Sequence, residues 1–340
     1  MLVAFVLVVC TAILLWRDPI ARRLGIVDLP DRDRKLHARP TPLVGGPVFI
    51  VAYLACVATI YFRMDDQEQA LYAITAIVLP HAMLGLIDDR LRLPTDARLL
   101  FSVSLTAAAL LADRSLVIRT VYFSFGGDLG LVPIRLQSHF AFFLTLMLIV
   151  GTVYSVNLID GKNGVLGVYF LSTTLFAGIW LHGGNGSLLL AAIAAILLFL
   201  VWNLRGLVFA GDSGAYLVGA LVASTILLIH REQATAMTFP IELIGLVVFV
   251  PAVDAARMLA RRLMRAQNPF AGDSDHFHHL LWRRFGPVGG LLAFGATVAV
   301  PLAAAVVFPR HAWAALLVAA VLYGSLVLVC HRHDLRTVST

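Results

Sequence analysis

Eleven apolar stretches, most of them long enough to cross a lipid bilayer, run through this chain of 340 residues. A helix needs about 20 mostly apolar residues to span the roughly 30 Å hydrocarbon layer. Hydrophobic residues make up 60% of the chain and charged residues 14%. One water-soluble core cannot bury so much apolar surface, which excludes a soluble enzyme, a disordered chain and a fibrous repeat. We therefore expect an all-α polytopic membrane protein with a single domain over 1–340.

The predicted spans share an apolar composition and roughly the length of one bilayer crossing. They fall at about 1–16, 43–62, 70–87, 99–112, 139–156, 164–181, 187–202, 213–230, 239–259, 288–307 and 312–330. The first run has neither a basic segment before it nor a small-residue cleavage site after it. We interpret it as a retained span rather than a signal peptide.

The basic residues are distributed unequally between the two sets of loops. If the N-terminus lies outside, the segments expected in the cytoplasm hold 19 Lys and Arg residues, and the opposite loops hold six. Lys and Arg favour the cytoplasmic side of a membrane. The sequence thus predicts the N-terminus outside and the C-terminus inside, and the net charge of +6 follows from this topology rather than from nucleic-acid binding.

One sizeable loop, 113–138, is expected on the outside. It contains two short extended runs, 116–123 and 129–136, separated by Gly126, Gly127 and Asp128. This pattern predicts a small external β-hairpin that caps the bundle.

The polar motifs converge on the predicted cytoplasmic face. Asp88 and Asp89 end the third span, and two adjacent carboxylates are tolerable when a cation neutralises them or one of them holds a proton. Asn157 and Asp160 are three residues apart and share a helical face. Asp212 begins the eighth span, where a simple N-cap is the alternative interpretation.

Two basic segments belong to the same face. Loop 260–287 holds Arg265 and three histidines, His276, His278 and His279, which favour a polyanion such as a diphosphate. Structural zinc is the weaker alternative, since no cysteine accompanies them. Lys35 and His37 precede the second span within a Pro/Gly framework, which a mere charge anchor does not need. Carboxylates with a divalent ion, together with Arg and His, fit phosphoryl transfer between a soluble phosphorylated donor and a lipid acceptor.

Five motifs carry a resemblance to a known family. They are Lys35-Leu36-His37-Ala38-Arg39-Pro40-Thr41-Pro42 with Gly45-Gly46, Gly85-Leu86-Ile87-Asp88-Asp89-Arg90, Asn157-Leu158-Ile159-Asp160-Gly161, Phe209-Ala210-Gly211-Asp212-Ser213-Gly214 and His276-Phe277-His278-His279. In this order the chain resembles the polyprenyl-phosphate N-acetylhexosamine-1-phosphate transferases, within them the branch of undecaprenyl-phosphate GlcNAc-1-phosphate transferases. Two positions depart from the family pattern: Asn163 stands where many members have Asp, and Ala215 where Ser is common.

The resemblance implies a reaction in a bacterial inner membrane. A UDP-N-acetylhexosamine, most simply UDP-GlcNAc, gives its sugar-1-phosphate to undecaprenyl phosphate and releases UMP, which begins the synthesis of a surface polysaccharide such as O-antigen. Mg²⁺ is required, with Mn²⁺ as a substitute, and a homodimer is compatible with the resemblance.

The resemblance also implies roles for residues. Asp212 is the expected metal ligand, with Asp89 as a second one. Asp88, Asp89 and Asp160 are the expected catalytic carboxylates. The expected substrate-binding residues are Lys35, His37, Asn157, Arg265, His276, His278 and His279. Direct attack by the lipid phosphate is favoured over a two-step path through a phospho-aspartate.

A transporter or flippase for an anionic or lipid-linked solute is the alternative function. Transporters tend to place polar residues near the bilayer midplane and to contain internal repeats. Here the polar residues lie at one face and the sequence has no visible repeat. The distribution favours the enzyme.

Overall fold

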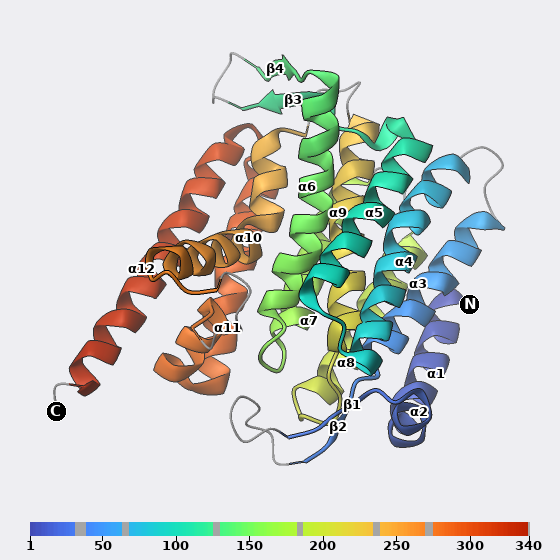
Figure 1. Ribbon diagram of the computed structural model, residues 1–340. Coiled ribbons are helices and arrows are strands. Elements are labelled where there is room, and N and C mark those ends of the chain that lie inside the picture. The colour runs from blue at the N-terminus through green and yellow to red at the C-terminus, as the bar shows by residue number, and fades with distance from the viewer. Residues whose placement is uncertain are drawn as a thin grey trace.

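The computed structural model describes residues 1–30, 39–62, 68–124, 130–181, 186–233, 239–268 and 275–338. Helices dominate these ranges (Figure 1). The α-helices are α1 (Leu2–Leu15), α2 (Arg17–Leu24), α3 (Gly45–Tyr61), α4 (Glu68–Leu91), α5 (Thr95–Ala112), α6 (Ser138–Ile159), α7 (Val165–Trp180), α8 (Gly186–Asn203), α9 (Gly211–Gln233), α10 (Ile241–Met264), α11 (Phe277–Val307) and α12 (Ala312–Val338). The strands are β1 (Val27–Asp28), β2 (Thr41–Pro42), β3 (Thr120–Phe123) and β4 (Val132–Arg135).

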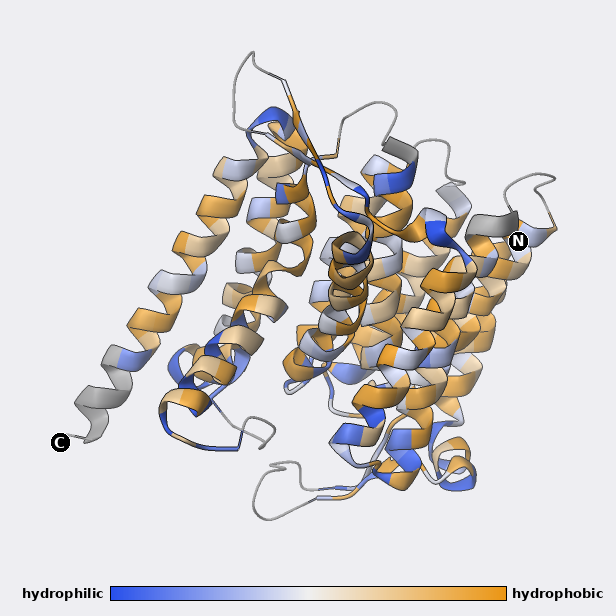
Figure 2. Ribbon diagram, turned by 45° about the horizontal axis from the view of Figure 1, so that its top comes forward, coloured by the Kyte–Doolittle hydropathy of each residue, from blue (hydrophilic) through white to orange (hydrophobic). Residues whose placement is uncertain are grey.

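Every predicted apolar run forms a helix. Within the described residues, eight helices are long and apolar enough to cross a membrane, namely α4, α5, α6, α8, α9, α10, α11 and α12. The pair α1 and α2, bent by 74°, is a ninth candidate span, and α3 and α7 are shorter apolar helices. Figure 2 shows hydrophobic residues along the helix bodies and hydrophilic residues gathered toward their ends. The all-α polytopic membrane fold is confirmed.

Two expected loops contain more helix than their hydropathy indicates. Residues 17–24 of the expected loop 17–42 form α2, and the expected loop 260–287 shrinks because α10 continues to Met264 and α11 begins at Phe277. Arg261 and Arg262 lie in the last turn of α10, where positive charge interacts favourably with the helix dipole. The expected start of a span at 288 instead marks a break within α11 at Gly286, whose φ is 71°.

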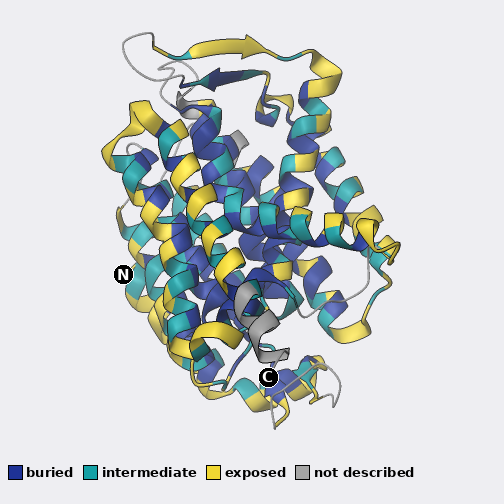
Figure 3. Cartoon of the chain, turned by 90° about the vertical axis from the view of Figure 1, so that its left-hand side faces the viewer, coloured by how far each residue is buried: buried dark blue, intermediate teal, exposed yellow. Residues whose placement is uncertain are grey.

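The two small sheets lie at opposite ends of the bundle (Figure 1). The predicted hairpin is confirmed: β3 pairs antiparallel with β4 over Thr120↔Arg135 to Phe123↔Val132. β3 packs inward and β4 is exposed (Figure 3). We call this end of the molecule the hairpin end, and the end with β1, β2 and the C-terminal end of α12 the site end.

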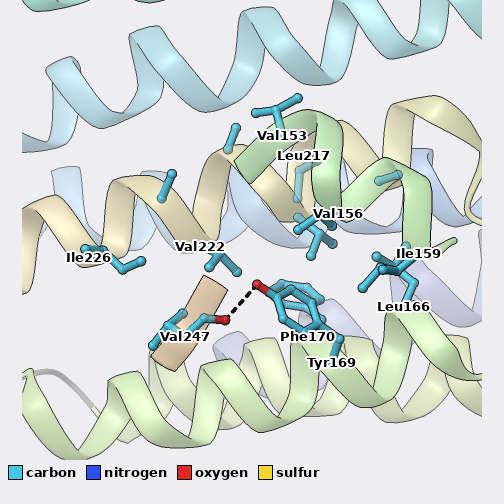
Figure 4. Close-up of a cluster of buried hydrophobic side chains, with 14 of the residues drawn as sticks. Val153, Val156, Ile159, Leu166, Tyr169, Phe170, Leu217, Val222, Ile226 and Val247 are labelled. Atoms are coloured by element: carbon cyan, nitrogen blue, oxygen red, sulfur yellow. Dashed lines mark hydrogen bonds between the residues drawn. The ribbon is translucent and has the colours of Figure 1, made fainter. Parts of the chain in front are cut away.

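Helix α9 forms the centre of the bundle and is the most buried of the candidate spans. It packs against α3, α4, α6 and α7. Figure 4 shows apolar side chains of α6, α7 and α9 interlocked around Tyr169 and Phe170. The Tyr169 hydroxyl donates a hydrogen bond to the Val247 carbonyl at 3.1 Å, which satisfies a polar atom inside this core.

A cavity of about 420 Å³ lies between α3, α4, α7, α8 and α9. Its lining is almost wholly apolar and includes no Asp, Glu, His, Lys or Arg from the described residues. Many lining residues, such as Ile60, Leu71 and Ile229, lie near the hairpin-end termini of their helices. The cavity is therefore separate from the polar residues of the site end.

Candidate functional site

The last turn of α4 meets the first turn of α9 at the site end. The two carboxylate oxygens of Asp89 accept hydrogen bonds from the backbone amides of Asp212, at 2.7 Å, and Ser213, at 3.0 Å. Asp89 thus caps α9 from another helix and satisfies amides that have no partner within α9. Its negative charge also lies at the positive end of the α9 dipole.

Two glycines permit this close approach. Gly211 has a φ of 70°, which L side chains rarely adopt, and an added Cβ would collide with the Asp89 carboxylate. A Cβ on Gly85 would collide with the backbone of Asp212 and Ser213. The glycines of the two predicted motifs therefore bring their aspartates together.

Asp88 is bound by the next helix. Its Oδ1 accepts a hydrogen bond from the Leu93 amide at 2.7 Å, and its Oδ2 accepts one from Arg98 Nη1 at 2.6 Å. Asp88 is 3% exposed and Arg98 is 22% exposed, so the carboxylate of this ion pair is buried and the guanidinium is partly buried. Asp88 therefore fixes the turn between α4 and α5 and holds the Arg98 guanidinium in the site.

Asp212 is a carboxylate of the same group and is more exposed than Asp88. Its Oδ1 accepts a hydrogen bond from Asn157 Nδ2 at 2.6 Å, its Oδ2 lies 3.9 Å from Arg98 Nη1, and its side chain is 32% exposed. The charges of Asp88 and Asp89 both act on it. The structure thus brings together the predicted residues of α4, α6 and α9.

Asp160 connects this acidic group to the histidines. It ends α6 and is half-buried. Burial, with a further contribution from the negative charge of Asp89, raises the pKa of Asp160 to about 7. The next residue, Gly161, leaves no room for a Cβ because His278 packs against it. Burial lowers the pKa of the neighbouring Lys162.

The three histidines have different surroundings. His276 donates a hydrogen bond from Nδ1 to Asp254 Oδ2 at 2.9 Å. His278 is 1% exposed, and neither of its ring nitrogens has a hydrogen-bond partner in the described part of the chain. His279 is partly exposed, with its ring centroid 4.3 Å from that of His278. His278 therefore keeps both ring nitrogens for a ligand, whereas His276 has its Nδ1 occupied by Asp254.

Sequence reasoning missed Asp254, Arg257 and Arg98. Arg257 lies inside the predicted span 239–259, and Arg98 lies directly before the predicted span 99–112. The spacing of Asp254 and Arg257, three residues apart in an apolar run, was the available signal, because such a pair shares one helix face. By contrast, the predicted Arg265 lies exposed after the end of α10. Lys35 and His37 fall outside the described residues.

The described residues contain no group of three or more His, Cys, Asp or Glu side chains arranged to hold a metal ion. Mg²⁺ does not require one, since it commonly binds through one or two carboxylates plus substrate phosphates and water. Asp212, open on one side and beside two other carboxylates, fits that mode of binding. The oxygens of Asp88 and Asp89 already accept hydrogen bonds, although each keeps a lone pair.

Known proteins with similar sequences place the chain in a family. The model of glycosyl transferase family 4 matches residues 70–230, which include the Asp88–Asp89, Asn157–Asp160 and Asp212 motifs. The undecaprenyl-phosphate alpha-N-acetylglucosaminyl 1-phosphate transferase of Escherichia coli K12 is 30% identical over 312 residues, 87% of this chain and 78% of the relative.

The same name belongs to a relative in Salmonella typhimurium LT2, 30% identical over 301 residues, 84% of this chain and 76% of the relative. The decaprenyl-phosphate N-acetylglucosaminephosphotransferase of Mycobacterium leprae is 29% identical over 357 residues, 91% of this chain and 84% of the relative. With these matches and with its carboxylates gathered at one end of a membrane bundle, the chain belongs to glycosyl transferase family 4 and is a membrane-embedded transferase.

Proposed function

We propose that this protein transfers GlcNAc-1-phosphate from UDP-GlcNAc to undecaprenyl phosphate and releases UMP. The observation that carries the proposal is the group of Asp88, Asp89 and Asp212, brought from two helices to one end of an apolar bundle, with Arg98 beside it. An acceptor with an anionic head and an apolar tail suits a site at that position. The names of the relatives support the same reaction.

The reaction exchanges one phosphoanhydride for another. An oxygen of the lipid phosphate attacks the β-phosphorus of the UDP-sugar and forms a new P–O bond. The bond from that phosphorus to the bridging oxygen breaks, and UMP leaves with the electron pair. Because negative charge accumulates on the phosphoryl oxygens and on UMP, positively charged and hydrogen-bonding groups stabilise the transition state.

The residues have separate roles in this proposal. Asp212, with Asp89, would hold Mg²⁺ (Mn²⁺ as the substitute ion), and the bound ion would supply positive charge to neutralise the phosphates. Asn157 orients Asp212 through its amide. Asp160, with its raised pKa, lines the donor pocket and can exchange a proton near neutral pH. His278 and His279 bind the diphosphate, and Lys35, His37 and Arg265 stay in the proposal as donor-binding residues.

Direct attack by the lipid phosphate is the better supported path. A phospho-aspartate path requires a carboxylate that can approach the donor phosphorus. Asp88 is 3% exposed and bonded to Arg98 and Leu93, and both oxygens of Asp89 accept backbone amides. Their surroundings suit positioning and charge balance better than nucleophilic attack.

The position in the cell follows from the same proposal. The excess of Lys and Arg in the loops expected in the cytoplasm supports a site end in the cytoplasm, where nucleotide sugars are made, and a hairpin end outside. The protein then lies in a bacterial inner membrane with its N-terminus outside and its C-terminus inside. Its product is the first lipid-linked intermediate of a surface polysaccharide such as O-antigen.

The test is transfer of radiolabelled GlcNAc-1-phosphate from UDP-GlcNAc to undecaprenyl phosphate by purified protein with Mg²⁺. We expect label in the lipid phase and one UMP per product, both lost on adding EDTA. Asp212→Asn should lower transfer at least about 10³-fold. Asp96→Asn is the matched control, because Asp96 is an exposed carboxylate at the same end.

The outcomes separate the donor from the reaction. Transfer from UDP-GalNAc or a deoxy-amino sugar nucleotide, with none from UDP-GlcNAc, would keep the reaction and change the sugar. No lipid-linked product from any donor, with folded protein, would overturn the proposal and favour a transporter.

A further inference from the structure

Asp254 is a charged residue inside α10, where a lone carboxylate would be costly in a membrane. It is 1% exposed. Its Oδ1 accepts hydrogen bonds from Arg257 Nη2 at 2.7 Å and from the Tyr323 hydroxyl at 3.0 Å, and its Oδ2 accepts one from His276 Nδ1 at 2.9 Å. The Phe277 amide lies 3.1 Å from both oxygens. The carboxylate is therefore saturated with donors.

These donors come from three helices. Arg257 belongs to α10, Tyr323 to α12, and His276 and Phe277 to the start of α11. Arg257 also donates to Tyr323 at 3.0 Å and to the Asp275 carbonyl at 2.6 Å, so it holds the residue just before the histidines. Asp254 caps the N-terminus of α11 from α10, as Asp89 caps α9 from α4.

This network fixes the histidine segment. His276 has Nδ1 occupied by Asp254, and its ring is parallel to that of His278 within 5°, with centroids 5.9 Å apart. His278 also packs against Gly161, next to Asp160. The position of His278 at the acidic group thus depends on a ring that Asp254 holds.

We infer that Asp254 is a positioning residue for the transfer reaction. It acts through His276 to hold His278 and His279 where the donor diphosphate binds, and His276 supports the site rather than binding the diphosphate through Nδ1. This inference rests on the proposed function for its kinetic test, but its structural test does not.

The chain offers a matched control for Asp254. Glu242 is a second buried carboxylate on α10, 8% exposed, at the hairpin end. Its Oε1 accepts a hydrogen bond from the Ser124 amide at 2.9 Å. Asp254→Asn and Glu242→Gln both replace a buried carboxylate of one helix by an amide, and only the first does so next to the histidines.

The experiment measures transfer kinetics over a range of UDP-GlcNAc concentrations for purified wild type, Asp254→Asn and Glu242→Gln. We expect Asp254→Asn to lower kcat/KM about 100-fold, mainly through a higher KM for the donor, because small displacements of binding groups have effects of that size. Glu242→Gln should stay within about threefold. If Asp254→Asn does not fold, Tyr323→Phe, which removes one donor, should still lower kcat/KM about fivefold.

Two further measurements exclude a merely structural role. Asp254→Asn and His276→Gln should not be additive, since both break the same connection, whereas either should add to Glu242→Gln. Hydrogen exchange in the protein without substrate should become faster over 275–282 in Asp254→Asn and stay unchanged over 85–93.

Wild-type kinetics and exchange in folded Asp254→Asn, or additivity with His276→Gln, would overturn the inference. Failure of wild type to transfer sugar phosphate would contradict the proposed function instead, and the exchange measurement would still decide the role of Asp254.

Discussion

Asp212, in the first turn of α9, and Asp254, inside α10, are both carboxylates of membrane helices, yet their surroundings differ. Asp254 accepts hydrogen bonds from four residues, and one of them is the cation Arg257. Asp212 accepts one from Asn157, lies beside the like charges of Asp88 and Asp89, and has the Arg98 cation at 3.9 Å. A carboxylate with all its hydrogen bonds made stabilises the structure around the site. A carboxylate that lacks them and lies among like charges is stabilised when a cation binds.

The largest expected effect concerns stability and distinguishes the two aspartates. Asp254→Asn should lower the free energy of unfolding by about 3 kcal/mol, because it leaves the partly buried Arg257 guanidinium without its counter-charge. Asp212→Asn should leave stability unchanged or raise it, because it removes repulsion with Asp88 and Asp89. Unfolding in detergent without divalent ions, followed by circular dichroism, measures both.

Equal destabilisation by Asp212→Asn and Asp254→Asn would contradict the conclusion that Asp254 stabilises the fold and Asp212 does not. Glu242→Gln controls for the removal of any buried carboxylate from α10, as its partner is a backbone amide rather than a cation.

The next effect concerns the contact that creates the acidic group. Gly211→Ala should destabilise the protein by about 1–2 kcal/mol, since Gly211 has a φ of 70° and a Cβ would displace the Asp89 carboxylate from the α9 amides. Transfer activity should fall as well, because Asp212 follows directly. Chemical unfolding and the transfer assay measure the two results.

Gly151→Ala is the matched control for that substitution. Gly151 lies within α6 and has open space where a Cβ would be placed. It should be neutral or stabilising by up to about 1 kcal/mol, because alanine favours a helix over glycine. An equal loss of stability in Gly211→Ala and Gly151→Ala would show that the hydrogen bonds that the α9 amides donate to Asp89 do not stabilise the protein.

Much of the fold was predictable, because hydropathy over 20 residues reports directly on the cost of placing a segment in lipid. All eleven predicted runs are helical, and the hairpin was found from its glycines and alternating residues. Hydropathy failed where charged residues continue a helix, as at Arg261 and Arg262, and where an amphipathic helix lies in an expected loop, as in α2.

The site was predictable as a set of motifs but not as a network. Asp88, Asp89, Asn157 and Asp212 meet because glycines allow α4 and α9 to approach, and the motifs include those glycines. Within the described part of the chain, His276 is hydrogen-bonded and His278 is not, because Nδ1 of His276 donates to Asp254, 22 residues earlier. Tyr323 of α12 holds the same carboxylate. Such a contact depends on helix packing, which no local pattern in one sequence reports.

The last prediction concerns the pH dependence of stability at Asp160, which lies between the two regions. Its pKa in the folded protein is about 7 against an ordinary value of 3.8, because of burial and the charge of Asp89. The folded state therefore holds a proton that the unfolded state has released, and this carboxyl makes wild-type stability fall as pH rises from about 4 to about 7. Asparagine does not titrate, so Asp160→Asn should gain stability relative to wild type between pH 5 and 7, with no further gain above that.

Thermal unfolding of both proteins at pH 5, 6, 7 and 8 without divalent ions measures this difference, and other titrating groups cancel in it. Asp89→Asn should be added to both proteins. The pH above which the stability difference stops growing should then be lower, because one of the two causes of the raised pKa of Asp160 is removed. A constant difference from pH 5 to 8 would mean that Asp160 stays ionised throughout. Asp160 would then resemble Asp254, whose ionised form is stabilised by its surroundings, rather than Asp212.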